Sequence, residues 1–383
     1  MVKLEELPDN AKRTALRKIE HLKICLEEDV NTHISPGFED IQLIHHAISN
    51  LDLARVNLEI SFLNHRLSAP ILITAMTGGA PGTEKINKTL ALAANDENVA
   101  LAVGSQRAGI EHSDLAYTYK IVREVAPDIP IIGNIGIAQI INSYSKRELT
   151  AAIEMIDADA LAIHFNALQE AVQPEGDVNF EKALDKLEQI IDYIDVPIIA
   201  KETGAGFSYD VAKKLHELGI DYIEIGGVGG TSFAAVEYYR AKKANDKAKE
   251  HLGKMFWDWG IPTVASILEV SLVDGVTIIA TGGVRTGIDI CKSIALGATI
   301  AGMARPFLPM AMRQDVDGVK TFISQLKSEL RTCMFLSGTK SLEALKKVPV
   351  VITGKTREWI ISRFGADIAN QIFKKFEEKT KIS

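Results

Sequence analysis

The sequence is poor in cysteine and has no long apolar run. Its 383 residues include three cysteines, Cys25, Cys291 and Cys333, which lie far apart and form no C-x-x-C pair. This spacing argues against a disulfide framework and against a zinc site. No run reaches the ~18 apolar residues of a membrane-spanning helix, and the charged N-terminus lacks the apolar centre of a signal peptide. We therefore expect a soluble, cytoplasmic protein with reduced cysteines.

Positive charge is also sparse. The 43 Lys and Arg residues against 50 Asp and Glu residues give a formal net charge of −7. No stretch clusters Lys and Arg with interleaved aromatic residues, as a nucleic-acid-binding surface would. We expect small molecules as partners, and neither nucleic acid nor a membrane.

Short, nearly continuous apolar runs alternate with segments of helical period from residue 68 onward. The eight runs read APILITAM, ALAVG, PIIGNIG, ALAIHFN, PIIAKE, YIEIGGVG, TIIATGG and TIAGMAR. Such runs are typical of parallel strands that are covered on both faces. Eight βα units predict a closed (β/α)₈ TIM barrel in the α/β class. A doubly wound sheet is the alternative, but no GxGxxG fingerprint follows an early strand.

Additional segments flank and interrupt the expected barrel of residues 68–306. Residues 1–67 are expected to form an N-terminal extension with a helix and an antiparallel strand or hairpin. The connection between the sixth and seventh runs contains an insertion at about 236–262, whose length favours a lid or an oligomer contact. Residues 307–383 have an amphipathic helical pattern, so we expect them to pack as helices on the barrel.

The fourth run ends in a cluster of polar side chains. Residues 161–170, LAIHFNALQE, supply His164, Asn166, Gln169 and Glu170 within seven positions. His164 and Asn166 share one face of an extended chain, and we expect the other two to follow where the backbone turns into a loop. Each residue alone would be read as a hydrogen-bonded core residue or a helix start. Together they indicate a reaction site at the carboxyl end of this strand.

The last two runs end in residues suited to a phosphate. In (β/α)₈ enzymes a phosphate frequently lies between the last two units. Gly282 and Gly283 would let the backbone approach an anion, and the following helix is expected to present unpaired amides. The amides of Met303 and Ala304 would close the same cradle.

The fifth and sixth runs add two further signals at the same end. The sixth reads IGGVGGTSF, and a tight turn with positive φ would explain one or two of its four glycines but hardly all of them. A phosphate position here is therefore a second possibility. Lys201 lies near the end of the fifth run. A cation inside an apolar strand requires an anionic partner.

The segments MTGG, GSQR, HxNxxQE, KExGxG, GGxGGTS, DWGIPT and GGxRxG occur in barrel order. With them the sequence resembles the type 2, flavin-dependent isopentenyl-diphosphate isomerases, from about Arg17 to Arg305. The resemblance implies FMN across the barrel mouth and the interconversion of isopentenyl diphosphate and dimethylallyl diphosphate in isoprenoid biosynthesis. It also implies self-association to a homotetramer or a larger assembly.

The resemblance further implies a role for individual residues. Those implied to contact FMN are Ala75, Met76, Thr77, Ser105, Asn134, Lys201, Thr231, Gly282, Gly283, Val284, Arg285, Met303 and Ala304. Those implied to contact the substrate are Arg17, Lys18, His21, Ser105, Gln106, Arg107 and Gln169. His164, Asn166 and Gln169 would act as catalytic residues that orient substrate and flavin. Glu170 would bind a Mg²⁺ ion that bridges to the diphosphate. This chain has Glu224 where the family commonly has Asp.

The implied isomerisation moves a double bond without net redox change. Ordinary side chains do not readily protonate an isolated alkene, so the hypothesis makes reduced FMN the acid and base, with NADPH needed only as reductant. An FMN-dependent 2-hydroxy-acid oxidase or dehydrogenase is one alternative. It would need an Arg–His pair with the His just after the sixth strand, where this chain reads GGVGGTS. A non-catalytic flavin- or phosphate-binding protein is another, and it leaves the polar cluster of residues 164–170 unexplained.

Overall fold

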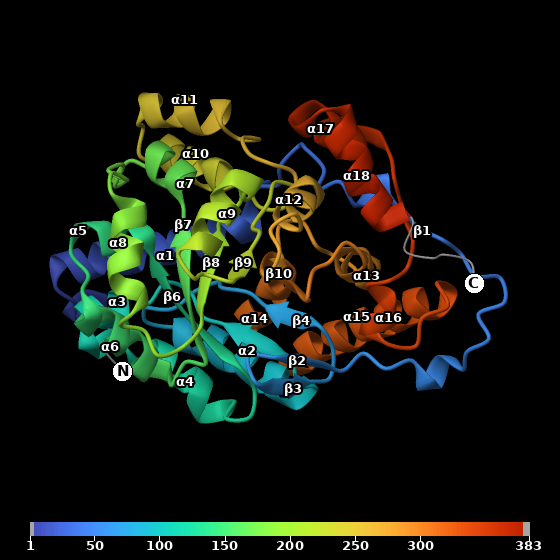
Figure 1. Cartoon of the computed structure of the whole chain (residues 1–383). Coiled ribbons are helices and arrows are strands. Elements are labelled where there is room, and N and C mark those ends of the chain that lie inside the picture. The colour runs from blue at the N-terminus through green and yellow to red at the C-terminus, as the bar shows by residue number, and fades with distance from the viewer. Residues whose placement is uncertain (1–3, 378–383) are drawn as a thin grey trace.

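A computed structural model describes residues 4–377 and has a closed parallel barrel at its centre (Figure 1). Around the barrel the strand order is β10-β11-β4-β5-β6-β7-β8-β9. The eight strands fall on the eight apolar runs, which confirms the expected TIM barrel. Their bounds are β4 (Ile71–Ile73), β5 (Ala100–Ala102), β6 (Ile131–Gly136), β7 (Ala160–Phe165), β8 (Ile198–Glu202), β9 (Tyr222–Glu224), β10 (Thr277–Ala280) and β11 (Ile300–Met303).

Helices connect successive strands and cover the outside of the barrel. They are α2 (Thr83–Glu97), α3 (Arg107–Glu111), α4 (Tyr117–Val125), α5 (Ile137–Asn142), α6 (Lys146–Ile156), α7 (Ala167–Val172), α8 (Ala183–Ile191), α9 (Tyr209–Glu217), α12 (Thr263–Val270) and α13 (Gly287–Ala295). Alternate strand residues point inward and outward. Leu72 thus joins the apolar cluster inside the barrel, whereas its neighbours Ile71 and Ile73 join the layer under the helices. The inside of the barrel is therefore filled by side chains.

The N-terminal extension closes one end of the barrel and reaches the other. A hairpin of β2 (Ile60–Phe62) and β3 (His65–Leu67) places Phe62 and Leu67 in the cluster that fills the barrel interior. Helix α1 (Asp9–Glu27) lies at the opposite end, where its side chains line the cavity described below. The expected helix and hairpin are both present. The outermost parts of the expected terminal segments, residues 1–3 and 378–383, lie outside the described residues.

The two terminal regions meet in an antiparallel ladder that the sequence did not reveal. Strand β1 (Ile41–Leu43) pairs with β12 (Val350–Ile352), and Ile41 lies opposite Ile352. Figure 1 shows this blue strand beside the red C-terminal helices. The remaining C-terminal helices are α14 (Leu308–Met312), α15 (Val316–Leu336), α16 (Leu342–Leu345), α17 (Gly354–Phe364) and α18 (Ala366–Glu377).

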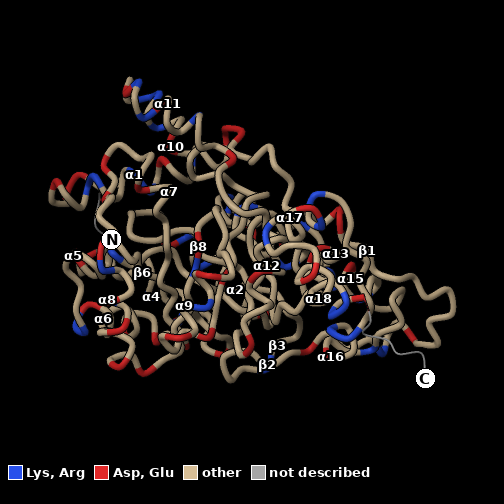
Figure 2. Tube along the Cα trace, turned by 45° about the horizontal axis from the view of Figure 1, so that its top comes forward, with Lys and Arg blue, Asp and Glu red and all other residues tan. Residues whose placement is uncertain are grey.

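The expected insertion forms two helices between β9 and α12. These are α10 (Phe233–Lys243), capped by the Ser232 hydroxyl, and α11 (Lys247–Met255). Figure 2 shows Lys and Arg scattered among Asp and Glu over the trace, as the modest net charge suggests. Among residues 4–377, no helix is both long and apolar enough to cross a membrane.

Candidate active site

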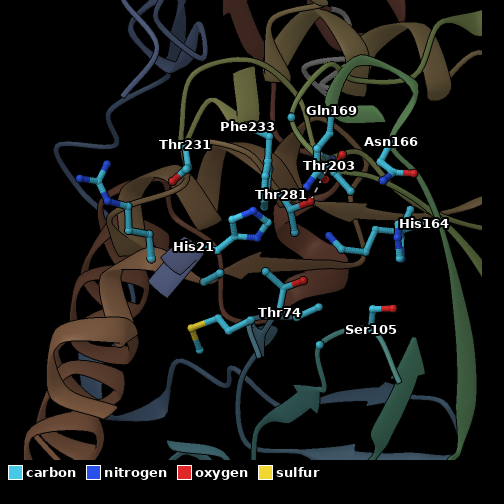
Figure 3. A pocket seen from close by; sticks show the side chains of 18 of the residues that line it. His21, Thr74, Ser105, His164, Asn166, Gln169, Thr203, Thr231, Phe233 and Thr281 are labelled. Atoms are coloured by element: carbon cyan, nitrogen blue, oxygen red, sulfur yellow. Dashed lines mark hydrogen bonds between the residues drawn. The ribbon is translucent and has the colours of Figure 1, made fainter. Parts of the chain in front are cut away.

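The carboxyl ends of all eight strands open into one cavity of about 300 Å³. This volume is within the range of small-molecule sites. Every predicted site residue except Gln106 lines it. Figure 3 shows His21 and Thr231 on one side of the space, with His164 and Asn166 on the other. Residues from the N-terminal extension and from the barrel thus share one site.

Gln106 differs from the expectation because its amide serves the barrel backbone. The side chain is fully buried, its Nε2 donates to the Ala152 carbonyl at 2.8 Å, and its Oε1 accepts from the Asn134 amide at 2.9 Å. With both ends of the amide occupied, Gln106 holds the end of β6 in place. It is not among the substrate contacts that we propose below.

His164, at the end of β7, is held as a neutral imidazole. Burial, together with the nearby charges of Lys201 and Lys18, lowers its pKa to about 3. Its Nδ1 lies 2.8 Å from Oδ1 of Asn134, whose own Nδ2 donates to a backbone carbonyl. Because the Asn134 oxygen must accept, the His164 proton is on Nδ1 and the lone pair is on Nε2. His164 therefore enters any reaction near neutral pH without a positive charge.

Gln169 and Glu170 lie on a helix, not on the expected loop. Helix α7 begins directly after Asn166, which occupies its N-cap position. Glu170 is buried and accepts from Nδ2 of Asn166 at 2.8 Å, from Nε2 of Gln173 at 2.5 Å and from the Asp177 amide at 2.7 Å. These three donors fix the direction of the carboxylate.

Lys201 has the anionic partner that its position in an apolar strand requires. Its Nζ lies 2.5 Å from Oε1 of Glu224 on the adjacent strand β9, and Thr74 donates to the same oxygen at 2.5 Å. Glu224 is almost fully buried. The longer Glu side chain at this family Asp position therefore still reaches the lysine. The pair places Lys201 in the lining of the cavity, with its counter-ion on the adjacent strand.

Two cavity-lining polar atoms have no hydrogen-bond partner within the described chain. They are Oγ1 of Thr77, after β4, and Oδ1 of Asn166, after β7. A buried polar atom without a partner is costly, and in native proteins such atoms commonly meet a ligand, an ion or water. Both atoms belong to residues that the sequence marked as site residues.

All four glycines of IGGVGGTSF have a structural cause, and, as expected, positive φ accounts for only two of them. Gly226 and Gly229 have positive φ values of 51° and 130°. A Cβ on Gly227 would lie 2.6 Å from the Cα of Thr263, and one on Gly230 would lie 2.7 Å from a backbone nitrogen of the next turn. Positive φ thus requires Gly226 and Gly229, and close backbone packing requires Gly227 and Gly230.

The turn after β10 packs on the same segment. Gly282 and Gly283 have φ values of 99° and 76°, and a Cβ on Gly282 would lie 2.2 Å from the carbonyl oxygen of Gly227. We call residues 226–230 together with 282–283 the glycine wall. Its surface toward the cavity is backbone, which is the surface that an anionic group can approach most closely.

Carboxylates accept from three backbone amides at and just before the start of α13, whereas the sequence led us to expect unpaired amides there. Asp289 accepts from the amides of Arg285 and Thr286, and Glu329 accepts from that of Gly287 at 2.7 Å. The helix start is thus satisfied by carboxylates. The Arg285 side chain instead donates to the carbonyl of Val284 and lines the cavity.

Basic side chains gather in the corner of the cavity under α1. They are Arg17, Lys18 and His21 from the helix and Arg107 from the start of α3. Burial, together with the charges of Arg17 and Arg107, lowers the pKa of Lys18 to about 7. We call these four residues the basic corner.

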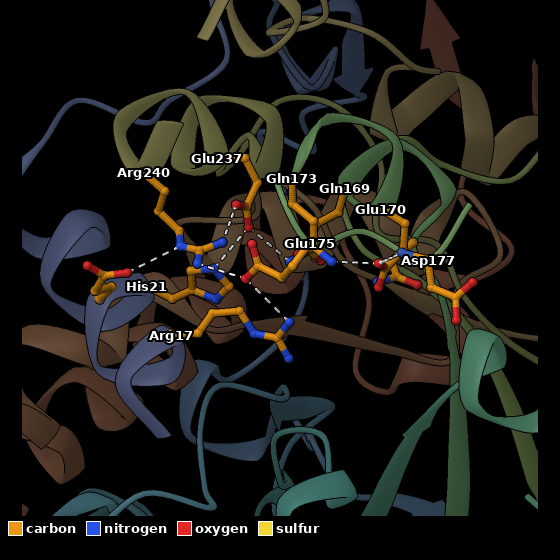
Figure 4. A network of polar contacts seen from close by, with 11 residues as sticks. Arg17, His21, Gln169, Glu170, Gln173, Glu175, Asp177, Glu237 and Arg240 are labelled. Carbon is orange, nitrogen blue, oxygen red and sulfur yellow. Dashed lines mark hydrogen bonds and ion pairs between the residues drawn. The ribbon is translucent and has the colours of Figure 1, made fainter. Parts of the chain in front are cut away.

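The sequence did not indicate a carboxylate network that joins the basic corner to the insertion. Glu237 of α10 is fully buried and contacts Nε2 of His21 at 2.9 Å, Nη1 of Arg240 at 2.7 Å and Nε2 of Gln169 at 3.4 Å (Figure 4). Burial alone would raise the pKa of Glu237, but His21 and Arg240 together lower it. Arg240 continues the network to Glu175 at 2.8 Å. The one available signal was the three-residue spacing of Glu237 and Arg240 on a helix.

Glu202 is a second carboxylate that the sequence did not single out. It lines the cavity at the end of β8, and burial raises its pKa to about 7. The amides of Gly204, Ala205 and Gly206 donate to it and oppose that rise. Because its bonds are to the loop that it begins, its evident role is to shape that loop.

Comparisons with known proteins place this geometry in a family. The family model described as FMN-dependent dehydrogenase matches residues 157–351, more than half of the chain. Solved structures share the fold: a putative lactate oxidase from Pediococcus acidilactici superposes with a TM-score of 0.64 at 16% identity, covering 92% of this chain and 95% of that one. A mandelate oxidase with an FMN adduct has a TM-score of 0.58 at 16% identity, covering 90% and 100%.

Relatives at much higher identity carry a different name. A Methanosarcina barkeri protein named isopentenyl-diphosphate delta-isomerase is 49% identical over 351 residues, 91% of this chain and 95% of its own. A Pyrococcus abyssi protein of the same name is 47% identical over 358 residues, 92% and 96%. Identity of this extent defines the family, whereas the oxidases share the barrel alone. The chain belongs to the isopentenyl-diphosphate delta-isomerase family and has the barrel of the FMN-dependent dehydrogenases.

Proposed function

We propose that this protein interconverts isopentenyl diphosphate and dimethylallyl diphosphate, with reduced FMN and Mg²⁺ bound in the cavity. One observation carries the proposal: a single cavity joins the glycine wall to the basic corner, with the buried carboxylate of Glu170 on its rim. The glycine wall suits the phosphate of a cofactor. The basic corner suits the diphosphate of a second molecule, so both can be bound at once.

The residues present fit FMN. Oγ1 of Thr77 lacks a partner within the described chain and faces the cavity, as expected of a group that bonds a flavin ring. Lys201 offers a cation whose charge is balanced by Glu224. Gly282, Gly283 and Arg285 would hold the phosphate, together with the turn of Met303 and Ala304. When bound and reduced, FMN would supply the proton-transferring group that an alkene requires.

The residues also fit Mg²⁺. No group of three or more His, Cys, Asp or Glu residues within positions 4–377 could form a closed metal site. Mg²⁺ does not need one, because it is commonly held by one or two carboxylates together with substrate phosphates and water. Glu170 supplies the carboxylate, and the unpartnered Oδ1 of Asn166, whose Nδ2 bonds to Glu170, supplies a second oxygen nearby.

The chain's own residues bind and orient the substrate. Arg17, Lys18 and Arg107 would neutralise the diphosphate, and His21 would contact it while Glu237 holds its ring. Gln169, whose Nε2 lies 3.4 Å from Glu237, would also contact the substrate. His164 stays neutral and offers a lone pair at Nε2, so it orients groups without adding charge.

The oxidase alternative is not favoured by the site. The segment of residues 225–232, which follows β9, contains no histidine to act as the base of a hydroxy-acid oxidase. A non-catalytic flavin-binding protein would not require the hydrogen-bonded Glu170 or the basic corner. Adding lactate or glycolate to the flavin-loaded protein provides the test, because bleaching of the flavin absorption would favour an oxidase.

Turnover tests the proposal itself. Purified protein with FMN, Mg²⁺ and excess NADPH or dithionite should bring either diphosphate to the same equilibrium mixture, with no oxidation of reductant beyond that needed to reduce the bound FMN. Failure to equilibrate the two diphosphates under these conditions would contradict the proposed function. NADPH is proposed only as the reductant, so dithionite should replace it.

We also propose that the protein self-associates to a homotetramer or larger. Met255 and Trp259 of the insertion are 65% and 61% exposed, more than large apolar side chains usually are. Light scattering of the purified protein checks the assembly, and a monomer at micromolar concentration would contradict it.

A further inference from the structure

Tyr119 of α4 lies under the basic corner and was not marked by any motif. The residue is fully buried, and its ring is surrounded by the turn that follows β4. A Cβ on Gly78 would lie 2.1 Å from a ring carbon of Tyr119, and one on Gly79 would lie 2.5 Å from its hydroxyl oxygen. The two glycines of the MTGG segment thus leave the space that this ring fills.

The Tyr119 hydroxyl belongs to a closed triangle of hydrogen bonds. It donates to the carbonyl of Ser105 at 2.5 Å, and Nζ of Lys18 donates to the Tyr119 oxygen at 2.8 Å. Nζ of Lys18 also donates to the same Ser105 carbonyl at 2.7 Å. A phenol has a single proton to donate, so its donation to Ser105 leaves its lone pairs to Lys18.

Two of the three N–H groups of Lys18 donate within this triangle, so one remains unused. Lys18 also lacks a counter-ion in the part of the chain that the structure describes. Within the described residues, no carboxylate lies at ion-pair distance from its Nζ, and the nearest charged residues, Arg17 and Arg107, are cations. A partly buried cation in these surroundings is unfavourable unless an anion joins it. The ammonium group lines the cavity, so its remaining N–H is available to a bound anion.

We propose that Tyr119 is a positioning residue for substrate binding, whose hydroxyl holds the Lys18 ammonium in the direction in which it meets the diphosphate. This inference rests on the proposed function, because it takes the anion at the basic corner to be the substrate's diphosphate. The hydroxyl also links two segments that are distant in sequence, α1 and the segment after β5, and it packs against the turn after β4. Tyr119 thereby docks the N-terminal helix onto the barrel mouth.

The test replaces the hydroxyl and keeps the ring. Tyr119→Phe retains the packing against Gly78 and Gly79, and Tyr117→Phe is the matched control on the same helix, because the buried Tyr117 hydroxyl has no hydrogen-bond partner within the described chain. The probe is inorganic pyrophosphate with Mg²⁺, titrated calorimetrically into the oxidised, FMN-loaded protein, so that no turnover occurs. Lys18→Met and the Tyr119→Phe/Lys18→Met double variant complete the cycle.

We expect Tyr119→Phe to weaken pyrophosphate binding on the order of tenfold, the scale of one hydrogen bond to a charged group. Tyr117→Phe should bind like the unmodified protein, and all variants should retain FMN. Adding Tyr119→Phe to Lys18→Met should cause no further loss, because the hydroxyl acts through the ammonium. In steady-state assays Tyr119→Phe should raise KM about tenfold and change kcat less than about twofold, since the contact is with a group that does not react.

Three results would overturn the proposal. One is unchanged binding in Tyr119→Phe, another is an equal loss in Tyr117→Phe, and the third is an equal loss when Tyr119→Phe is made in the Lys18→Met background. A different result would overturn the proposed function instead: if Lys18→Met bound pyrophosphate normally, the basic corner would not hold the diphosphate. The two failures are therefore distinguishable.

Discussion

Two sets of residues around the cavity are built in different ways. On the glycine wall, residues 226–230 and 282–283, the backbone of one turn packs directly on the backbone of the next. Outside the glycine wall, the side chains of residues 164–170, the basic corner and Glu237 form hydrogen bonds and ion pairs across several chain segments, and we call this set the charged wall. The glycine wall is thus set by sterics, and the charged wall is set by electrostatics.

This difference predicts how each wall fails. A side chain added to the glycine wall has no space, so its cost should appear as lost folding stability and lost FMN. A side chain altered in the charged wall leaves the backbone in place, so its cost should appear in substrate binding. The predictions below test whether stability and binding separate in this manner.

The largest effect is expected for Gly282→Ala. The new Cβ would lie 2.2 Å from the carbonyl oxygen of Gly227, in a residue with φ of 99°. We expect a loss of about 3–4 kcal/mol in the free energy of unfolding, together with lost FMN. Gly219→Ala is the control, because its φ is 89° and no atom lies within 4 Å of the added Cβ. It should lose only about 1 kcal/mol, and equal losses in urea unfolding would contradict the packing argument.

Glu170→Gln should give the largest binding effect. It removes the negative charge that we propose binds Mg²⁺ and keeps the shape of the side chain. We expect Mg²⁺-dependent substrate binding to weaken by about 100-fold or more, since even indirect partners of a metal site contribute 10–100-fold. Calorimetry measures the loss, and Glu188→Gln on the exposed face of α8 is the control. If FMN is lost instead and substrate binding is kept, Glu170 belongs to the cofactor side.

Glu237→Gln should have a smaller effect in the same direction. The variant keeps a hydrogen-bonding oxygen but leaves Arg240 and His21 without the buried charge that they share. We expect substrate affinity to fall on the order of tenfold, with the FMN spectrum unchanged. Fluorescence or absorbance of the bound flavin monitors the cofactor, and a changed flavin spectrum would show that the two walls are not independent.

The smallest effect concerns pH. Burial lowers the pKa of Lys18 to about 7, so the free protein loses this positive charge as pH rises through 7. A bound diphosphate restores the charge, and binding above pH 7 must therefore take up a proton. Affinity should fall about fivefold more between pH 7 and pH 8 in the unmodified protein than in Lys18→Met. Calorimetry in buffers of different ionisation enthalpy measures the uptake, and identical pH profiles would contradict this role for Lys18.

The fold could be predicted well from the sequence because each barrel strand corresponds to a local sequence pattern. Each strand is a short apolar run, and the eight runs coincide with the eight strands. The ladder between β1 and β12 was not predicted, because it joins Ile41 to Ile352 across about three hundred positions. No local pattern records such a pairing.

The candidate site was predicted unevenly for the same reason. The cluster of residues 164–170 is contiguous, so its presence at the mouth followed from one strand. The network around Glu237 combines α1, α7 and α10, and Tyr119 acts through a carbonyl and an ammonium from two other segments. For the glycines of residues 226–230, the sequence indicated the place but not the cause, because close packing depends on a turn fifty residues away.

The most direct test of the two-wall account is a crystal structure of the FMN-loaded protein with isopentenyl diphosphate and Mg²⁺. The account predicts the flavin phosphate at Gly282–Gly283, with the diphosphate at the basic corner and Mg²⁺ between it and Glu170. A diphosphate bound at the glycine wall, or a metal ion remote from Glu170, would contradict it.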